Sequence, residues 1–203
     1  MKDELDILRE VGTIAAAQAS GAVSEILGRQ IKLNLPSLDI IAYDQLHKKT
    51  HIEKVGIAIF ARILSGLQGE IALILDEKDA FKLMNLSYKI DESEKNAGIF
   101  TEVGLSLMKE IGNIAICSYT AALGMLLKRQ IITSIPTLMN GSTDTIINSI
   151  FRPRSGQDYA FLIEAVFEEP QMQIHGGFCL GLTSGAASDI KETCKKLLEE
   201  LEQ

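Results

Sequence analysis

The 203-residue chain has no tryptophan, only four prolines and three cysteines, and its aromatic residues make up 5% of the total. Few prolines, with 46% hydrophobic and 23% charged residues, indicate a compact, ordered chain. No apolar run approaches the roughly 20 residues that cross a bilayer. The acidic start Met1-Lys2-Asp3-Glu4 also differs from the basic start of a signal peptide. We therefore expect a cytoplasmic protein without membrane insertion.

Positive charge is also scarce, with 20 Lys and Arg residues against 27 Asp and Glu residues and a net charge of −7. Binding to a nucleic-acid backbone requires clustered cations that displace counterions. The charge balance therefore argues against nucleic acid as a partner and favours a protein or a small molecule.

The three cysteines, Cys117, Cys179 and Cys194, are widely spaced and form no C-x-x-C motif. They predict buried or partly buried thiols in a reducing compartment. His47 and His51 stand four residues apart without a suitably spaced Asp, Glu or Cys, which favours a solvated loop over a metal site. Walker, G-x-S-x-G and H-E-x-x-H motifs are absent too. We expect no metal ion or cofactor of the protein's own.

What the chain does contain is an internal repeat. Residues 5–38 laid over residues 105–138 without a gap share 12 of 34 positions, whereas composition alone would give about two or three. We therefore predict a single domain, residues 1–203, built of two repeats at about 1–90 and 98–203.

Hydrophobic periodicity predicts the same order of elements in each half: a helix, several strands and a helix. For the first half we expect a helix over 3–27, strands over 30–35, 38–43, 55–63 and 70–75, and a helix over 76–86. For the second half we expect a helix from 93 or 101 to 127, strands over 130–139, 145–151, 159–167 and 173–182, and a helix over 186–201 capped by Thr183 or Ser184. The fold class is therefore α+β, a tandem pseudo-two-fold repeat whose antiparallel sheet is flanked by long helices.

Two local features complete this prediction. Helical spacing places five residues of the segment 101–127 on one face, which we expect to pack inward: Val103, Leu107, Ile111, Ile114 and Ser118. The composition of Asn140-Gly141-Ser142 and of Ser155-Gly156-Gln157-Asp158 is typical of turns.

Ser106, Glu110 and Asn113 form a polar row on the flank of this apolar face, and Asp6, Glu10 and Thr13 occupy the same positions in the first half. Spacings of i, i+4 and i+7 bring each row onto consecutive turns of one helix. An isolated pair of this kind is ordinarily just solvated. Here Asn disfavours the helix interior, and the Glu stands in both diverged copies, so a functional role gains weight.

A carboxylate and an amide without a histidine, a cysteine nucleophile or a metal suit one kind of chemistry. The amide of Asn113 can accept a hydrogen bond from a water while donating to a neighbouring oxygen, and so hold the water in line. The carboxylate of Glu110 can bind a Lys or Arg of another protein. The pair therefore fits assistance to a hydrolysis whose phosphoryl group and metal ion reside on a partner.

These positions resemble a known signature, Asp/Ser-x-x-x-Glu-x-x-Asn followed after 22 residues by Pro. The second half supplies Ser106, Glu110, Asn113 and Pro136, and the first half supplies Asp6, Glu10, Thr13 and Pro36. The pattern is similar to that of the CheC, CheX and FliY chemotaxis phosphatases. A tandem repeat of this length without an added domain resembles CheC most.

The resemblance implies removal of the phosphoryl group from the aspartyl-phosphate of the response regulator CheY. Asn113 would orient the attacking water, Glu110 would pair with a Lys of the regulator, and Ser106 and Pro136 would support them. The Mg²⁺ ion would belong to the regulator, and CheD would be a further protein partner.

Thr13 departs from the pattern because a Thr hydroxyl turns back onto the helix backbone and lacks the amide. We therefore predict that the first-half site, Asp6, Glu10, Thr13 and Pro36, is degenerate. Two non-enzymatic alternatives remain: an adaptor that binds CheD or phosphorylated CheY, and a structural component of the flagellar switch.

Overall fold

A computed structural model of the chain describes residues 4–35, 37–42, 55–87, 101–151 and 159–201. Pro36, His47, His51 and the expected turn at 155–158 lie outside these residues. The elements follow in the order α1 (Glu4–Leu27), β1 (Lys32–Asn34), β2 (Leu38–Ala42), β3 (Val55–Ser65), β4 (Gly69–Asp76), α3 (Glu77–Ser87), α5 (Glu102–Leu126), β5 (Ile132–Thr133), β6 (Thr137–Ser142), α6 (Thr143–Ile150), β7 (Tyr159–Glu169), β8 (Met172–Leu182) and α7 (Ser184–Leu201).

The strands form one sheet in the order β1-β7-β8-β4-β3-β5, in which β2 also pairs with β7 and β6 also pairs with β3. Every strand pair in this sheet is antiparallel. The predicted α+β class with an antiparallel sheet is confirmed. If each of β1 to β4 is swapped with its counterpart among β5 to β8, the same strand order results, read from the opposite edge of the sheet. A duplicated unit would have this symmetry. The duplication and its boundaries stay predictions.

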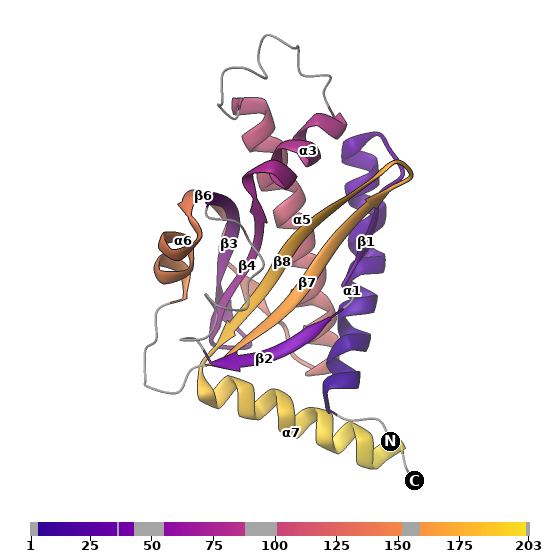
Figure 1. The fold of residues 1–203 in the computed structure, drawn as a ribbon. Coiled ribbons are helices and arrows are strands. Elements are labelled where there is room, and N and C mark those ends of the chain that lie inside the picture. The colour runs from indigo at the N-terminus through magenta and orange to yellow at the C-terminus, as the bar shows by residue number, and fades with distance from the viewer. Residues whose placement is uncertain (1–3, 36, 43–54, 88–100, 152–158, 202–203) are drawn as a thin grey trace.

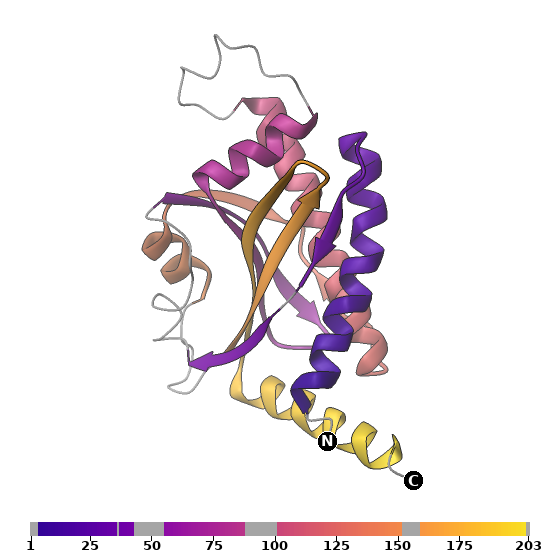
Figure 2. The same cartoon turned by 45° about the vertical axis from the view of Figure 1, so that its right-hand side comes forward.

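The two longest helices, α1 and α5, lie side by side on one face of the sheet and run in opposite directions (Figures 1 and 2). Their first turns therefore lie at opposite ends of the helical layer. Helix α3 packs beside the start of α5, and α7 crosses the other end of the molecule, where it contacts α1 (Figure 1). Helix α6 covers part of the opposite face of the sheet through Ile146, Ile147 and Ile150.

Local capping explains where the long helices begin and end. Helix α1 stops at Leu27 because Gly28 adopts the left-handed φ of 61° that favours glycine. Helix α5 begins after Thr101, whose hydroxyl accepts a 3.1 Å hydrogen bond from the Gly104 backbone N–H. Thr183 caps α7 in the same way, through the Ala186 N–H at 3.4 Å. These three predicted helices are confirmed.

The strand predicted over 145–151 is wrong, since Thr143–Ile150 is the helix α6. The hydroxyl of Ser142 accepts a hydrogen bond from the Thr145 backbone N–H and caps the helix. Ile146, Ile147 and Ile150 then recur at helical spacing and are buried. Their β-branched side chains suggested a strand, but burial of one helical stripe outweighs that preference.

The turn predicted at Asn140-Gly141-Ser142 is also wrong, because these residues end strand β6. Asn140 pairs with Ile57 and Gly141 with Gly56 on β3. Hydrogen bonding along the ladder with β3 outweighs the local turn composition.

The predicted inward face of α5 is correct for Ile111, which is buried, and for Leu107 and Ile114, which pack against the core. It is wrong for Val103, which is 52% exposed, and the buried face extends to Gly104, Met108 and Ala115. Gly104 brings α5 so close to α3 that an added Cβ would lie 2.6 Å from a Met84 side-chain sulfur. The close contact on this side turns Val103 outward.

Candidate functional site

The candidate site is the outer face of the N-terminal half of α5, which carries Ser106, Glu110 and Asn113 on consecutive turns. Ser106 and Glu110 are exposed, and Asn113 is half-buried. The structure therefore keeps the predicted row together on one helix, with a carboxylate and an amide accessible from outside. Their roles in function stay predictions.

Gly112, which directly precedes Asn113, anchors this part of α5 to the sheet. A Cβ added to Gly112 would lie 2.5 Å from the Ile59 Cβ on β3, a distance that real side chains do not tolerate. The corresponding Gly12 of α1 has more room, because its nearest neighbour is the Leu35 Cδ1 at 3.5 Å. Helix α5 thus rests directly on a strand, which holds Asn113 on a rigid element.

Cys117 is a member of the site that the sequence prediction missed. It was expected to be buried or partly buried, but it is exposed, whereas Cys179 and Cys194 are buried. The Cys117 thiol donates to the Asn113 Oδ1 across 3.5 Å. Desolvation of the thiol, and secondly the nearby Glu110 carboxylate, raise the pKa of Cys117. The spacing of four residues from Asn113 was the available signal.

The corresponding face of α1 is arranged differently. The Thr13 hydroxyl donates to the Arg9 carbonyl oxygen across 3.1 Å, as the helix position predicts for a threonine. Arg9 also pairs with the Asp6 carboxylate at 3.0 Å, while Glu10 is exposed. Two of the three polar groups on this face therefore already have partners within their own helix.

Only one of the two predicted prolines, Pro136, lies in the part of the chain that the structure describes. Pro136 is half-buried at the start of the segment that enters β6, directly after Ile135, which is 90% exposed. Pro36, the first-half counterpart, lies outside the described residues. The supporting role of Pro136 stays a prediction.

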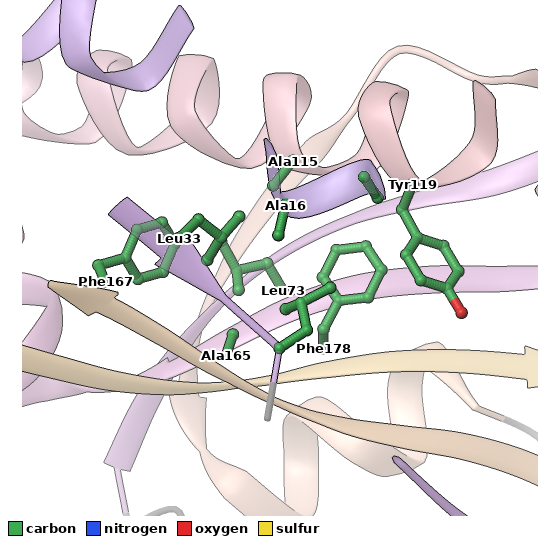
Figure 3. A pocket seen from close by; sticks show the side chains of 10 residues that line it. Ala16, Leu33, Leu73, Ala115, Tyr119, Ala165, Phe167 and Phe178 are labelled. Carbon is green, nitrogen blue, oxygen red and sulfur yellow. The ribbon is translucent and has the colours of Figure 1, made fainter. Parts of the chain in front are cut away.

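An apolar cavity lies between the two long helices and the sheet (Figure 3). Ala16 and Ala115 line it from the helices, while Leu33, Leu73 and Phe178 line it from the strands. Its volume is about 10 Å³, which is near the lower limit for a single water molecule. The cavity is therefore too small for a substrate.

Within the five described stretches, no group of three or more His, Cys, Asp or Glu side chains is placed to hold a metal ion. The helices in those stretches also include none long and apolar enough to span a membrane.

No protein-family model matches the chain. Its sequence is 29% identical over 141 residues to the CheY-P phosphatase CheC of Bacillus subtilis (strain 168), in an alignment covering 66% of this chain and 65% of CheC. The chain thus matches slightly less than two thirds of the length of this relative.

Several solved structures share the fold. FliY from Thermotoga maritima has a TM-score of 0.75 and 22% identity, over 95% of this chain and 96% of FliY. The FliM middle domain from H. pylori has a TM-score of 0.67 and 12% identity, over 95% of this chain and 99% of that domain. The predicted resemblance is confirmed: the chain is similar in sequence to CheC and in fold to FliY.

Proposed function

We propose that this chain is a phosphatase that hydrolyses the aspartyl-phosphate of a CheY-type response regulator, with the outer face of α5 as its active face. Its similarity to the CheY-P phosphatase CheC supports the reaction. One observation carries the choice of site: an exposed carboxylate and a half-buried amide, Glu110 and Asn113, lie one turn apart on a helix anchored to the sheet.

Asn113 acts on the attacking water. The water oxygen forms a bond to phosphorus while the bond from phosphorus to the regulator's aspartate oxygen breaks, which yields inorganic phosphate and a free carboxylate. The Asn113 side-chain oxygen accepts a hydrogen bond from the water, and its NH₂ group donates to a phosphoryl oxygen. Because little else is required of the protein, holding the water in line is its main contribution.

Glu110 docks the regulator. Its exposed carboxylate accepts hydrogen bonds from a Lys or Arg of the receiver domain and so orients the complex. Ser106 lies one turn earlier at the contact surface, and Pro136 shapes the chain that enters β6. The regulator brings its own Mg²⁺ as part of the substrate.

The same proposal includes a cellular setting. The protein acts in the cytoplasm on phosphorylated CheY, and CheD is a second protein partner with no residue yet assigned to its contact. The first-half face of Asp6, Glu10 and Thr13 is catalytically degenerate, because its threonine lacks the amide and bonds to its own backbone.

A non-enzymatic adaptor is the competing function. The α1 face supports it, since that face keeps an exposed Glu10 but no amide. Such an adaptor would bind CheD or phosphorylated CheY without changing the lifetime of the phosphate. A structural role in the flagellar switch would instead give stable assembly with motor proteins.

A time course of regulator dephosphorylation tests the proposal. The regulator is phosphorylated with a small phosphodonor, the donor is removed, and phosphate loss is followed with wild type, Asn113→Ala or no added protein. Faster loss with wild type alone supports the phosphatase. Unchanged decay with all three, together with retained binding of the regulator, would establish the adaptor instead.

A further inference from the structure

We infer that Cys117 is a positioning residue that orients the side-chain amide of Asn113. The inference rests on the proposed function, since it assigns a role to Cys117 in that same reaction. The observation behind it is the contact across one turn of α5, where the Cys117 Sγ lies 3.5 Å from the Asn113 Oδ1. Cys117 does not touch the substrate in this scheme and acts only through Asn113.

The chemistry of the two groups decides the direction of the amide. A protonated thiol is a donor, whereas the two ends of a carboxamide are an acceptor oxygen and a donor nitrogen. The thiol therefore favours the orientation in which Oδ1 faces Cys117 and the NH₂ group points away. One lone pair of Oδ1 stays available for the water, and both N–H groups stay available for the phosphoryl oxygens.

The protonation state and the exposure of Cys117 both support this role. Desolvation and the Glu110 carboxylate raise the thiol pKa, which keeps the sulfur protonated and therefore a donor near neutral pH. The thiol is also exposed, so it lies on the same open face as Glu110.

The first half provides an internal comparison. The position equivalent to Cys117 is Ala17, which has no donor, and the position equivalent to Asn113 is Thr13. The Thr13 hydroxyl bonds to the Arg9 carbonyl within its own helix. The half without an amide therefore also lacks the group that would orient one.

The test compares Cys117→Ser, which keeps a donor, with Cys117→Ala, which removes it and installs the residue found at position 17. A single hydrogen bond of modest net strength corresponds to a fall of about threefold to fivefold in kcat for Cys117→Ala. KM, and affinity for a receiver domain loaded with beryllium fluoride and Mg²⁺, should stay unchanged. Cys117→Ser should keep more of the wild-type kcat than Cys117→Ala, since its hydroxyl can donate either to the Asn113 side chain or, as Ser20 and Ser24 do, to the carbonyl four residues earlier. Ser118→Ala, at the next residue and turned about 100° around the helix, is the matched control and should have no effect.

The outcomes separate this inference from the proposed function. If wild type does not accelerate dephosphorylation, the proposed function fails. If wild type is active and Cys117→Ala keeps its kcat, or loses affinity instead, only the role of Cys117 is wrong. A side-chain ¹H–¹⁵N signal, assigned to Asn113 by its loss in Asn113→Ala, provides a readout independent of turnover. It should shift in Cys117→Ala more than in Cys117→Ser, and equal spectra would overturn the inference.

Discussion

The outer faces of α1 and α5 carry the same polar pattern at equivalent positions but use it differently. On α1, the Asp6 carboxylate pairs with Arg9, and the Thr13 hydroxyl bonds to the Arg9 carbonyl oxygen. On α5, Ser106 carries no charge, so the equivalent of the Asp6 ion pair cannot form. The amide at the third position of the row keeps hydrogen-bonding capacity for an external group.

The two helices also differ in how they rest on the sheet. Gly112 brings α5 against Ile59 so closely that no side chain fits between them, whereas Gly12 lies in ordinary contact with Leu35. The same polar pattern is therefore present on both faces, but only α5 combines an exposed carboxylate and a half-buried amide with a close contact to the sheet.

Substitution of Asn113 and of Thr13, the third residue of each polar row, should give the largest difference in dephosphorylation rate. Asn113→Ala removes the group that holds the water, and we expect a fall of about a hundredfold in kcat. Thr13→Ala removes a hydroxyl that is already bonded within its helix, and the dephosphorylation rate should stay at the wild-type value. Single-turnover assays with both variants measure this. Equal losses would show that the two faces are both catalytic.

Substitution of the two anchoring glycines should separate the faces in stability. Gly112→Ala forces its new methyl group against the root of the Ile59 side chain, so we expect a loss of about 2 kcal/mol in the free energy of unfolding. Gly12→Ala has room, and reduced freedom of the unfolded chain should stabilise it by about 0.5–1 kcal/mol. Urea denaturation of both variants measures the difference. A loss as large for Gly12→Ala would remove the packing contrast.

Neutralising the two exposed glutamates should separate docking from chemistry. Glu110→Gln weakens a charge-assisted hydrogen bond to the regulator, and we expect its Kd to rise about tenfold. Glu10→Gln should leave the Kd of the catalytic complex unchanged. Titration with a receiver domain loaded with beryllium fluoride and Mg²⁺ provides the measurement. If Glu10→Gln weakened binding as much as Glu110→Gln, the α1 face would also dock the regulator.

Restoring the amide on α1 should have the smallest effect. In the Asn113→Ala background, Thr13→Asn supplies a group able to hold water, and we expect a gain of about threefold in the remaining rate. The gain should be small because Ala17 provides no donor to orient the new amide. Addition of Ala17→Cys should raise the rate further. The same dephosphorylation assay checks both steps. If neither substitution raises the rate, residue 13 does not explain the inactivity predicted for the α1 face.

Much of the fold was predictable because it depends on neighbours in the chain. Gly28 and Thr101 mark helix ends through local backbone geometry and a local hydrogen bond. The segment Thr143–Ile150 was misassigned because three isoleucines resemble a strand, and only their packing beneath the sheet reveals a helix. The exposure of Val103 was missed for a similar reason, since the close approach of Gly104 to Met84 on another helix is not encoded in the local periodicity.

The sequence by itself determined the repeated row and the contrast between Asn113 and Thr13, because residue identity and helical spacing are local properties. Only the tertiary structure decided which side of α5 is open and how firmly it is held. The contact of Gly112 with Ile59 joins residues more than 50 positions apart, and no local periodicity encodes it. That contact holds one side of the helix against the sheet, and the polar row lies on the outer side.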